Sequence, residues 1–166
     1  PVRPSLRGLW NEPAWRGAQV GVVGEFLPRS SSHRPRTEFK AVYREDEGLY
    51  VFFRVFDRYV VSTRQDYQAM VCNDSCVEFF VEPRPGRGYL NFEINCGGCM
   101  LLYHIKDPTR TGDGFADYSP LPAEADRLVK RYHSLPSVVY PEIKKPVQWR
   151  LEYFIPLAVF ERCVGR

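Results

Sequence analysis

The sequence predicts an all-β fold, an antiparallel β-sandwich of the immunoglobulin or jelly-roll kind with little helix. Three observations support this prediction. Glycine and proline are frequent, at 12 and 14 of 166 residues, and aromatic residues make up 14% of the chain, which together favour short strands joined by turns. Several short runs alternate polar and apolar side chains, and no helix-length amphipathic segment separates them. The length suits one domain, so we expect residues 1–166 to form a single sandwich.

The first strong strand signals form a hairpin. Residues 38–44 alternate in polarity, an acidic turn follows at 45–48, and residues 49–56 are apolar almost throughout. We therefore expect the second strand of this hairpin to be buried on both faces.

Three further strands are expected in meander order. They span residues 76–82, 89–95 and 99–106, with turn-forming sequences between them. The next stretch, 107–125, is rich in Gly, Pro, Thr and Asp and is predicted to be a long loop, of the kind that often rims a binding site.

The end of the chain contains one more strand signal. Residues 149–155 form an apolar, aromatic run that Pro156 stops, and residues 157–163 are predicted to make one or two helical turns. Helix content is therefore expected to be small.

Charge and hydropathy exclude several classes of partner. The net charge of +3 lacks the clustered basic excess of phosphate-backbone binders, so we expect no nucleic acid partner. Apolar runs reach only about five residues, far short of the roughly 20 that span a membrane. No membrane partner is expected, and the first residues contain no signal-peptide segment.

Strand alternation predicts one polar patch. Asn91, Glu93 and Asn95 share a face of their strand, while Glu78 and Arg54 each lie opposite the apolar residues of theirs. If the three strands are neighbours, these five side chains meet on one sheet. The patch is either a ligand-binding surface or a buried network in which Arg54 is neutralised by Glu78 or Glu93.

Sugar binding also needs an aromatic face for the apolar side of a pyranose ring. Tyr89 and Tyr103 belong to strands next to the polar patch, and each is either a stacking residue or part of the core. The other aromatic candidates are Tyr67, Tyr118 and Trp149. Trp10 and Trp15, near the start of the chain, are predicted to be core anchors.

Four motifs follow one another along the chain. They are GLWNEPAW at 8–15, an acidic turn with LYVFFRVFD ending at 57, NDSCVEFFVEP at 73–83 with YLNFEINCGG at 89–98, and WRLE to IP at 149–156. In this order they resemble the motifs of family 9 carbohydrate-binding modules, in a single-domain branch.

The resemblance implies a lectin-like bacterial sandwich that binds a mono- or oligosaccharide without cleaving it, often beside glycoside hydrolases that act on polysaccharides. It also implies that calcium is a possible cofactor and that the protein is extracellular or periplasmic. Members of this branch continue beyond the "IP" strand with an aromatic-rich segment, which is missing here. We therefore expect an exposed edge through which two copies can pair as a homodimer.

Two other functions remain open. Glu78 and Glu93 form a carboxylate pair of the kind that a glycoside hydrolase uses. Against catalysis, a nearby Arg54 would lower both pKa values and remove the protonated acid. The third alternative is a protein-interaction sandwich without sugar binding.

The cysteines allow several states. Cys72, Cys76, Cys96 and Cys99 form a C-x3-C and C-x2-C pattern, which is compatible with a zinc site, a disulfide or free buried thiols. With five cysteines in all, at least one has no partner within the chain.

Overall fold

The computed structural model describes residues 2–28, 30–112 and 114–165. Over these residues the chain forms eleven strands, two α-helices and two short 3-10 turns. The elements are η1 (Pro13–Trp15), β1 (Gly21–Val23), β2 (Arg36–Arg44), β3 (Gly48–Asp57), β4 (Val60–Ser62), η2 (Val71–Asn73), β5 (Cys76–Val81), β6 (Tyr89–Asn95), β7 (Met100–Thr111), β8 (Gly114–Pro120), α1 (Ala123–Leu128), β9 (Lys130–His133), β10 (Val139–Ile143), β11 (Val147–Pro156) and α2 (Leu157–Val164).

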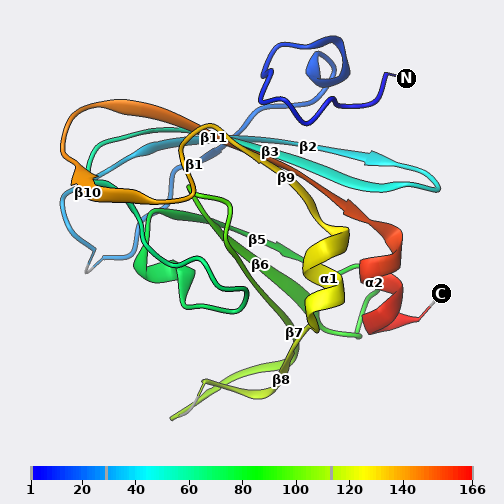
Figure 1. The fold of residues 1–166 in the computed structure, drawn as a ribbon. Helices are drawn as coiled ribbons and strands as arrows, with labels where there is room; N and C mark the ends of the chain where they lie inside the picture. Colours follow the sequence, from blue (N-terminus) through cyan, green and yellow to red (C-terminus); the bar gives the residue numbers. More distant parts are fainter. Residues whose placement is uncertain (1, 29, 113, 166) are drawn as a thin grey trace.

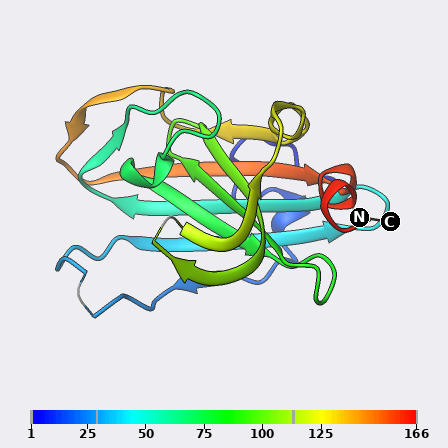
Figure 2. The same ribbon diagram turned by 90° about the horizontal axis from the view of Figure 1, so that it is seen from below.

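Two antiparallel sheets face one another and confirm the predicted all-β sandwich (Figure 1). One has the strand order β1-β2-β3-β11-β9 and the other the order β5-β6-β7-β8. A β4–β10 ribbon lies at one end, and α1 and α2 lie at the other. Figure 2 shows the strands of the four-stranded sheet crossing those of the five-stranded sheet obliquely.

The predicted hairpin and meander are confirmed. β2 pairs with β3 from Arg36↔Phe56 to Arg44↔Gly48, and β5, β6 and β7 follow one another as neighbours. Gly48 has φ +147°, and a Cβ there would collide with the backbone of Ile155 on β11. The tight turn into β3 therefore requires glycine.

The predicted loop over residues 107–125 is wrong. β7 continues to Thr111 and pairs with β8 as a two-stranded arm, and α1 begins at Ala123. The register shifts between Asp107 and Arg110, around Pro108, which has no N–H to donate. Pairing satisfies the other backbone groups, so the turn-rich composition does not prevent a strand here. The weakly patterned strands β1, β4, β9 and β10 were also not predicted.

The main core fills the space between the sheets. Leu90, Phe92 and Ile94 of β6 face Phe53 of β3 and Leu151 of β11 in one cluster of buried apolar side chains. Phe92 also contacts Phe160 of α2, with ring centroids 6.4 Å apart. α2, the helix predicted at the end of the chain, therefore closes this end of the core. No helix in the described part of the chain has the length and apolar character needed to cross a membrane.

A second apolar cluster lies on the outer face of the five-stranded sheet. Trp10 and Trp15 of the N-terminal segment pack on Phe52 and Tyr50 of β3, which confirms the prediction that both tryptophans are core anchors. The segment lies across this sheet as a separate layer in Figure 1.

Buried charges fasten this segment. Glu152 of β11, fully buried, accepts hydrogen bonds from Gly8 N (2.7 Å) and Trp15 Nε1 (3.1 Å). Lys40 Nζ donates to the carbonyl oxygens of Trp10 (3.2 Å) and Trp15 (3.1 Å). Because each buried charge has partners only when the segment is in place, the segment is an integral part of the fold.

We expect Trp15→Ala to lower the free energy of unfolding by about 3–5 kcal/mol, because it leaves a large cavity and removes one partner of buried Glu152. Chemical denaturation measures the change. The matched control is Tyr43→Ala, at an aromatic that is 62% exposed, which should shift stability by no more than about 0.5 kcal/mol. Equal effects of the two substitutions would contradict this account of the N-terminal segment.

Candidate functional site

The outer face of the four-stranded sheet brings together five of the seven predicted site residues, Glu78, Tyr89, Asn91, Glu93 and Tyr103. Glu78 of β5 lies directly opposite Glu93 of β6, and Asn91 of β6 lies opposite Tyr103 of β7. These side chains point away from the core because their neighbours Val77, Phe92 and Leu102 point into it.

Asn91 is the most buried polar member of this group. It is 4% exposed, and its Nδ2 donates to Glu93 Oε1 over 2.7 Å. Its Oδ1 is also buried, yet it has no hydrogen-bond partner among the described residues. An unsatisfied buried acceptor costs about 1–3 kcal/mol. A ligand that donates a hydrogen bond there would recover this free energy.

Negative charge accumulates beside Asn91. Partial burial raises the pKa of Glu78, and the charge of Glu93 raises it further. Burial followed by the charges of Glu78 and Glu93 likewise raises the pKa of the Cys76 thiol. The surface is therefore rich in acceptors and suited to ligands that present hydrogen-bond donors.

Aromatic rings flank the polar group on both sides. Phe80 and Tyr89 make an edge-to-face pair with centroids 5.9 Å apart, and Tyr103 and Tyr118 lie 5.2 Å apart. Phe80 is 56% exposed. Tyr89 and Tyr103 are among the predicted site residues, whereas Phe80 was missed, although it shares the alternation of Glu78 and could have been found from it. The 3-10 turn η2 packs against β5 and β6. Burial, followed by the charges of Glu93 and Glu78, raises the pKa of its Cys72 thiol, so the turn borders the same face.

The prediction that Arg54 joins this patch is wrong. Its strand β3 pairs with β2 and β11, so it belongs to the other sheet. Arg54 Nε donates to Glu38 Oε2 (2.9 Å), and its guanidinium lies 4.3 Å from the Trp10 ring centroid. Arg54 thus forms a structural ion pair under the N-terminal segment. It does not neutralise Glu78 or Glu93.

Asn95 also lies outside the patch, because its side chain is buried in a network of hydrogen bonds within the protein. The side chain is fully buried, and Nδ2 donates to Asp74 Oδ2 (2.9 Å) and to the Arg64 carbonyl oxygen (2.9 Å). Its Oδ1 accepts from the Cys99 N–H over 2.8 Å. Every polar atom of the Asn95 side chain is thereby used inside the protein, although alternation places it on the same face as Glu93.

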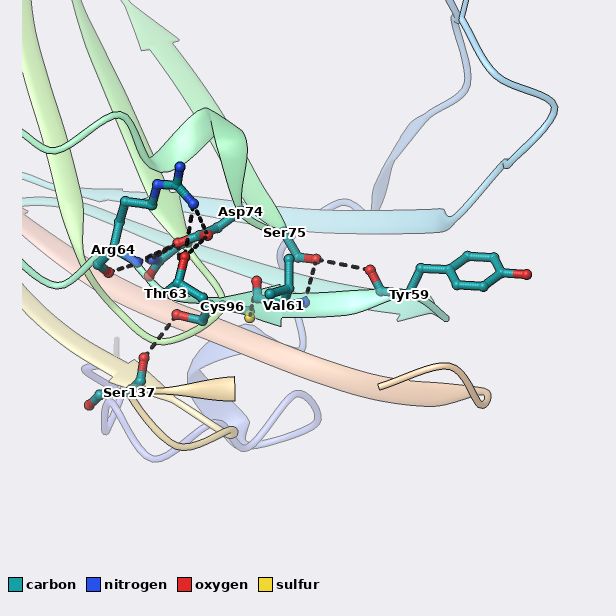
Figure 3. Close-up of polar contacts among 10 residues, drawn as sticks. Tyr59, Val61, Thr63, Arg64, Asp74, Ser75, Cys96 and Ser137 are labelled. Carbon is teal, nitrogen blue, oxygen red and sulfur yellow. Dashed lines mark hydrogen bonds and ion pairs between the residues drawn. The ribbon is translucent and has the colours of Figure 1, made fainter. Parts of the chain in front are cut away.

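Asp74, which was missed by the sequence analysis, is the centre of this network (Figure 3). Its carboxylate accepts from the backbone N–H groups of Thr63 (3.0 Å) and Arg64 (2.9 Å), from Thr63 Oγ1 (3.0 Å) and from Asn95. Arg64 Nη1 lies 3.3 Å from Asp74 Oδ1, so the two side chains also form an ion pair. Burial alone would raise the pKa of Asp74, but these hydrogen bonds outweigh it and lower the pKa.

The structure has the five cysteines as free thiols. All five cysteines are unpaired, with Cys96 buried and Cys72 exposed. Within residues 2–28, 30–112 and 114–165, no three His, Cys, Asp or Glu side chains are grouped to hold a metal ion.

Residues 17–163 match the family model described as carbohydrate-binding family 9. The chain belongs to this family. Carbohydrate binding is therefore the function of the domain, and its family is one of binding modules. No curated protein sequence matches the chain.

The family 9 domain also resembles a solved structure. A crystal structure of a proposed carbohydrate-binding protein from Bacteroides uniformis ATCC 8492 superposes with a TM-score of 0.75 at 23% identity. The match covers 89% of this chain and 64% of that protein, so the chain spans under two thirds of its length. At this identity the likeness concerns the fold.

We expect Asp74→Asn to lower the free energy of unfolding by about 1–3 kcal/mol near neutral pH, because several buried donors lose their charged acceptor. The folded-state pKa of Asp74 is depressed, so its stabilisation is complete above the unfolded pKa of about 3.9. It is lost as pH falls through the lower folded pKa. Denaturation of both proteins as a function of pH should show the difference shrinking below about pH 4. A constant difference down to the acid limit would show that the Asp74 charge is irrelevant.

Proposed function

We propose that the outer face of the four-stranded sheet is the sugar-binding surface of this family 9 domain, and that it recognises a mono- or oligosaccharide without cleaving it. The buried, unpaired Oδ1 of Asn91 beside the Glu93 carboxylate is the observation that carries the proposal. The opposite surface of the sandwich is covered by the N-terminal segment.

Each part of the surface matches one part of a sugar. Asn91 Oδ1 and the carboxylates of Glu78 and Glu93 accept hydrogen bonds from hydroxyl groups. The exposed ring of Phe80, paired with Tyr89, offers an apolar face to the C–H side of a pyranose, and the pair Tyr103 and Tyr118 does the same across the sheet. The strands hold these groups before the ligand arrives, which reduces the entropy cost of binding.

We expect isothermal titration calorimetry against neutral mono- and oligosaccharides to give a saturable signal that weakens about tenfold in Asn91→Ala and in Glu93→Gln. Calorimetry is preferable to tryptophan fluorescence, because all three tryptophans are buried away from this face. Runs with calcium and with a chelator test the calcium dependence implied by the family resemblance.

The controls are Asn11→Ala and Glu25→Gln, which are matched substitutions at exposed positions outside the surface. Circular dichroism confirms that each variant is folded, and Asn91→Asp provides a second variant of nearly the same shape. If sugar binding persists in every one of these surface variants, the sugar site lies elsewhere on the protein. No signal with any sugar from a folded sample would favour a protein-interaction domain.

Glycoside hydrolysis is the second candidate, and one observation favours it. Glu78 and Glu93 are directly opposed, and the pKa of Glu78 is raised as a general acid requires. Arg54 does not lower the pKa values of this carboxylate pair, because Arg54 lies on the other sheet. The proposal of a binding surface nevertheless has the support of the family assignment.

We expect no release of aryl alcohol from aryl glycosides by the purified protein, because the two carboxylates serve as acceptors for sugar hydroxyls. A colorimetric assay across pH measures it. Turnover that disappears in Glu78→Gln and persists in the control Glu25→Gln would establish hydrolysis in place of simple binding.

A further inference from the structure

A cavity of about 460 Å³ opens beside β9, the edge strand of the five-stranded sheet, apart from the outer face of the four-stranded sheet. The segment that follows β4, the β6–β7 turn and the pair α1 and β9 form its walls. None of the residues proposed above to contact the sugar lines it. The cavity is thus a second and separate concave site.

The lining of this cavity is strongly cationic. Arg64 lies on one wall, and a run of basic side chains from the end of α1 through β9 lies on another. The basic or protonatable lining residues are Arg64, Arg127, Lys130, Arg131 and His133, against the single acidic residue Asp126. This charge is opposite in sign to that of the outer face, where Glu78 and Glu93 meet.

Two arginines of the lining each use a single guanidinium nitrogen, Nη1, for contacts within the protein. Their other guanidinium nitrogens are available to a ligand. Arg64 Nη1 donates to Thr63 Oγ1 (2.8 Å) and pairs with Asp74, and Arg131 Nη1 pairs with Asp126 Oδ1 (2.7 Å). Neither Nε nor Nη2 of these two side chains bonds to any described residue. Both side chains keep some exposed surface, 40% and 18% respectively. Guanidinium groups held in this way can receive an oxyanion.

The β6–β7 turn holds a further polar side chain of the cavity, His133, in place. His133 Nδ1 donates to the Leu135 carbonyl oxygen (2.7 Å), so Nε2 of the neutral ring is an acceptor, and it has no partner among the described residues. Its ring packs on Gly98, which has φ +88°, and a Cβ there would lie 2.6 Å from His133 Cδ2. Glycine at this position therefore allows the imidazole to lie directly against the turn.

We infer that this cavity binds a sugar that carries an oxyanion, that is, a carboxylate, sulfate or phosphate group on a monosaccharide. Its volume lies in the range of about 300–1,000 Å³ that is typical of small-molecule sites. The arginines and Lys130 supply donors for the anion, while Asp126, Gln65, Ser137 and His133 supply acceptors and donors for ring hydroxyls. The inference depends on family membership for the sugar class and does not depend on the outer-face site.

The test is calorimetry at low ionic strength with glucuronate, glucose 6-sulfate and glucose 6-phosphate, beside glucose and inorganic sulfate and phosphate. We expect the anionic sugars to bind, and we expect Arg131→Gln to lower their affinity by about tenfold or more. Raising the salt from about 20 to about 200 mM should also weaken binding. The three anionic sugars show which oxyanion is preferred.

Arg110→Gln is the matched control, because Arg110 lies on the β7–β8 arm over Phe115 and outside the cavity. Lys130→Gln, at an exposed lining residue, serves as a second variant if Arg131→Gln does not fold. Anionic-sugar binding should persist in Asn91→Ala, which separates this site from the outer face.

Three results would overturn the inference. They are no binding of any anionic sugar to the folded protein, equal binding of glucose and glucuronate, and unchanged affinity in both Arg131→Gln and Lys130→Gln. If inorganic sulfate or phosphate binds as tightly as the anionic sugars, the ligand is not a sugar, because the sugar ring then contributes nothing to the affinity.

Discussion

The buried carboxylate of Asp74 is the interaction on which both sites depend. Through Thr63 and Arg64 it fixes the segment that leaves β4, and through Asn95 it fixes the end of β6 and the following turn. Asp74 also directly follows η2, which borders the outer face of the four-stranded sheet. One charged group, satisfied by several hydrogen bonds, thus positions loops that connect different strands and border both proposed binding surfaces.

The two faces of the sandwich differ because only one of them is closed by the chain itself. Tryptophans 10 and 15 and the buried charges of Lys40 and Glu152 bind the N-terminal segment to the five-stranded sheet. Separating the segment would expose aromatic surface and leave two charges without partners, which is costly. The outward-pointing side chains of a sheet surface are therefore available to a ligand mainly on the four-stranded sheet.

Charge separates the two proposed sites. Glu78 and Glu93 on the outer face repel anions and can accept hydrogen bonds from hydroxyl groups, whereas Arg64 and Arg131 in the cavity beside β9 attract anions. A polysaccharide with both neutral and acidic units presents groups that suit each of them. The two proposals together give the family 9 domain two recognition chemistries in one sandwich, with no residue shared between them.

Local sequence determined the main strands and much of one face. Because side chains alternate with a period of two, Glu78, Asn91 and Glu93 were predicted correctly to share a surface once their strands paired. Strand order is not local, however, so the sequence could not show that Arg54 belongs to the other sheet or that Asn95 turns its side chain into the Asp74 network. The arm made by β7 and β8 and the cationic cavity likewise depend on tertiary pairing. Only the fold brings segments distant in the chain close enough for their charges and hydrogen bonds to act together.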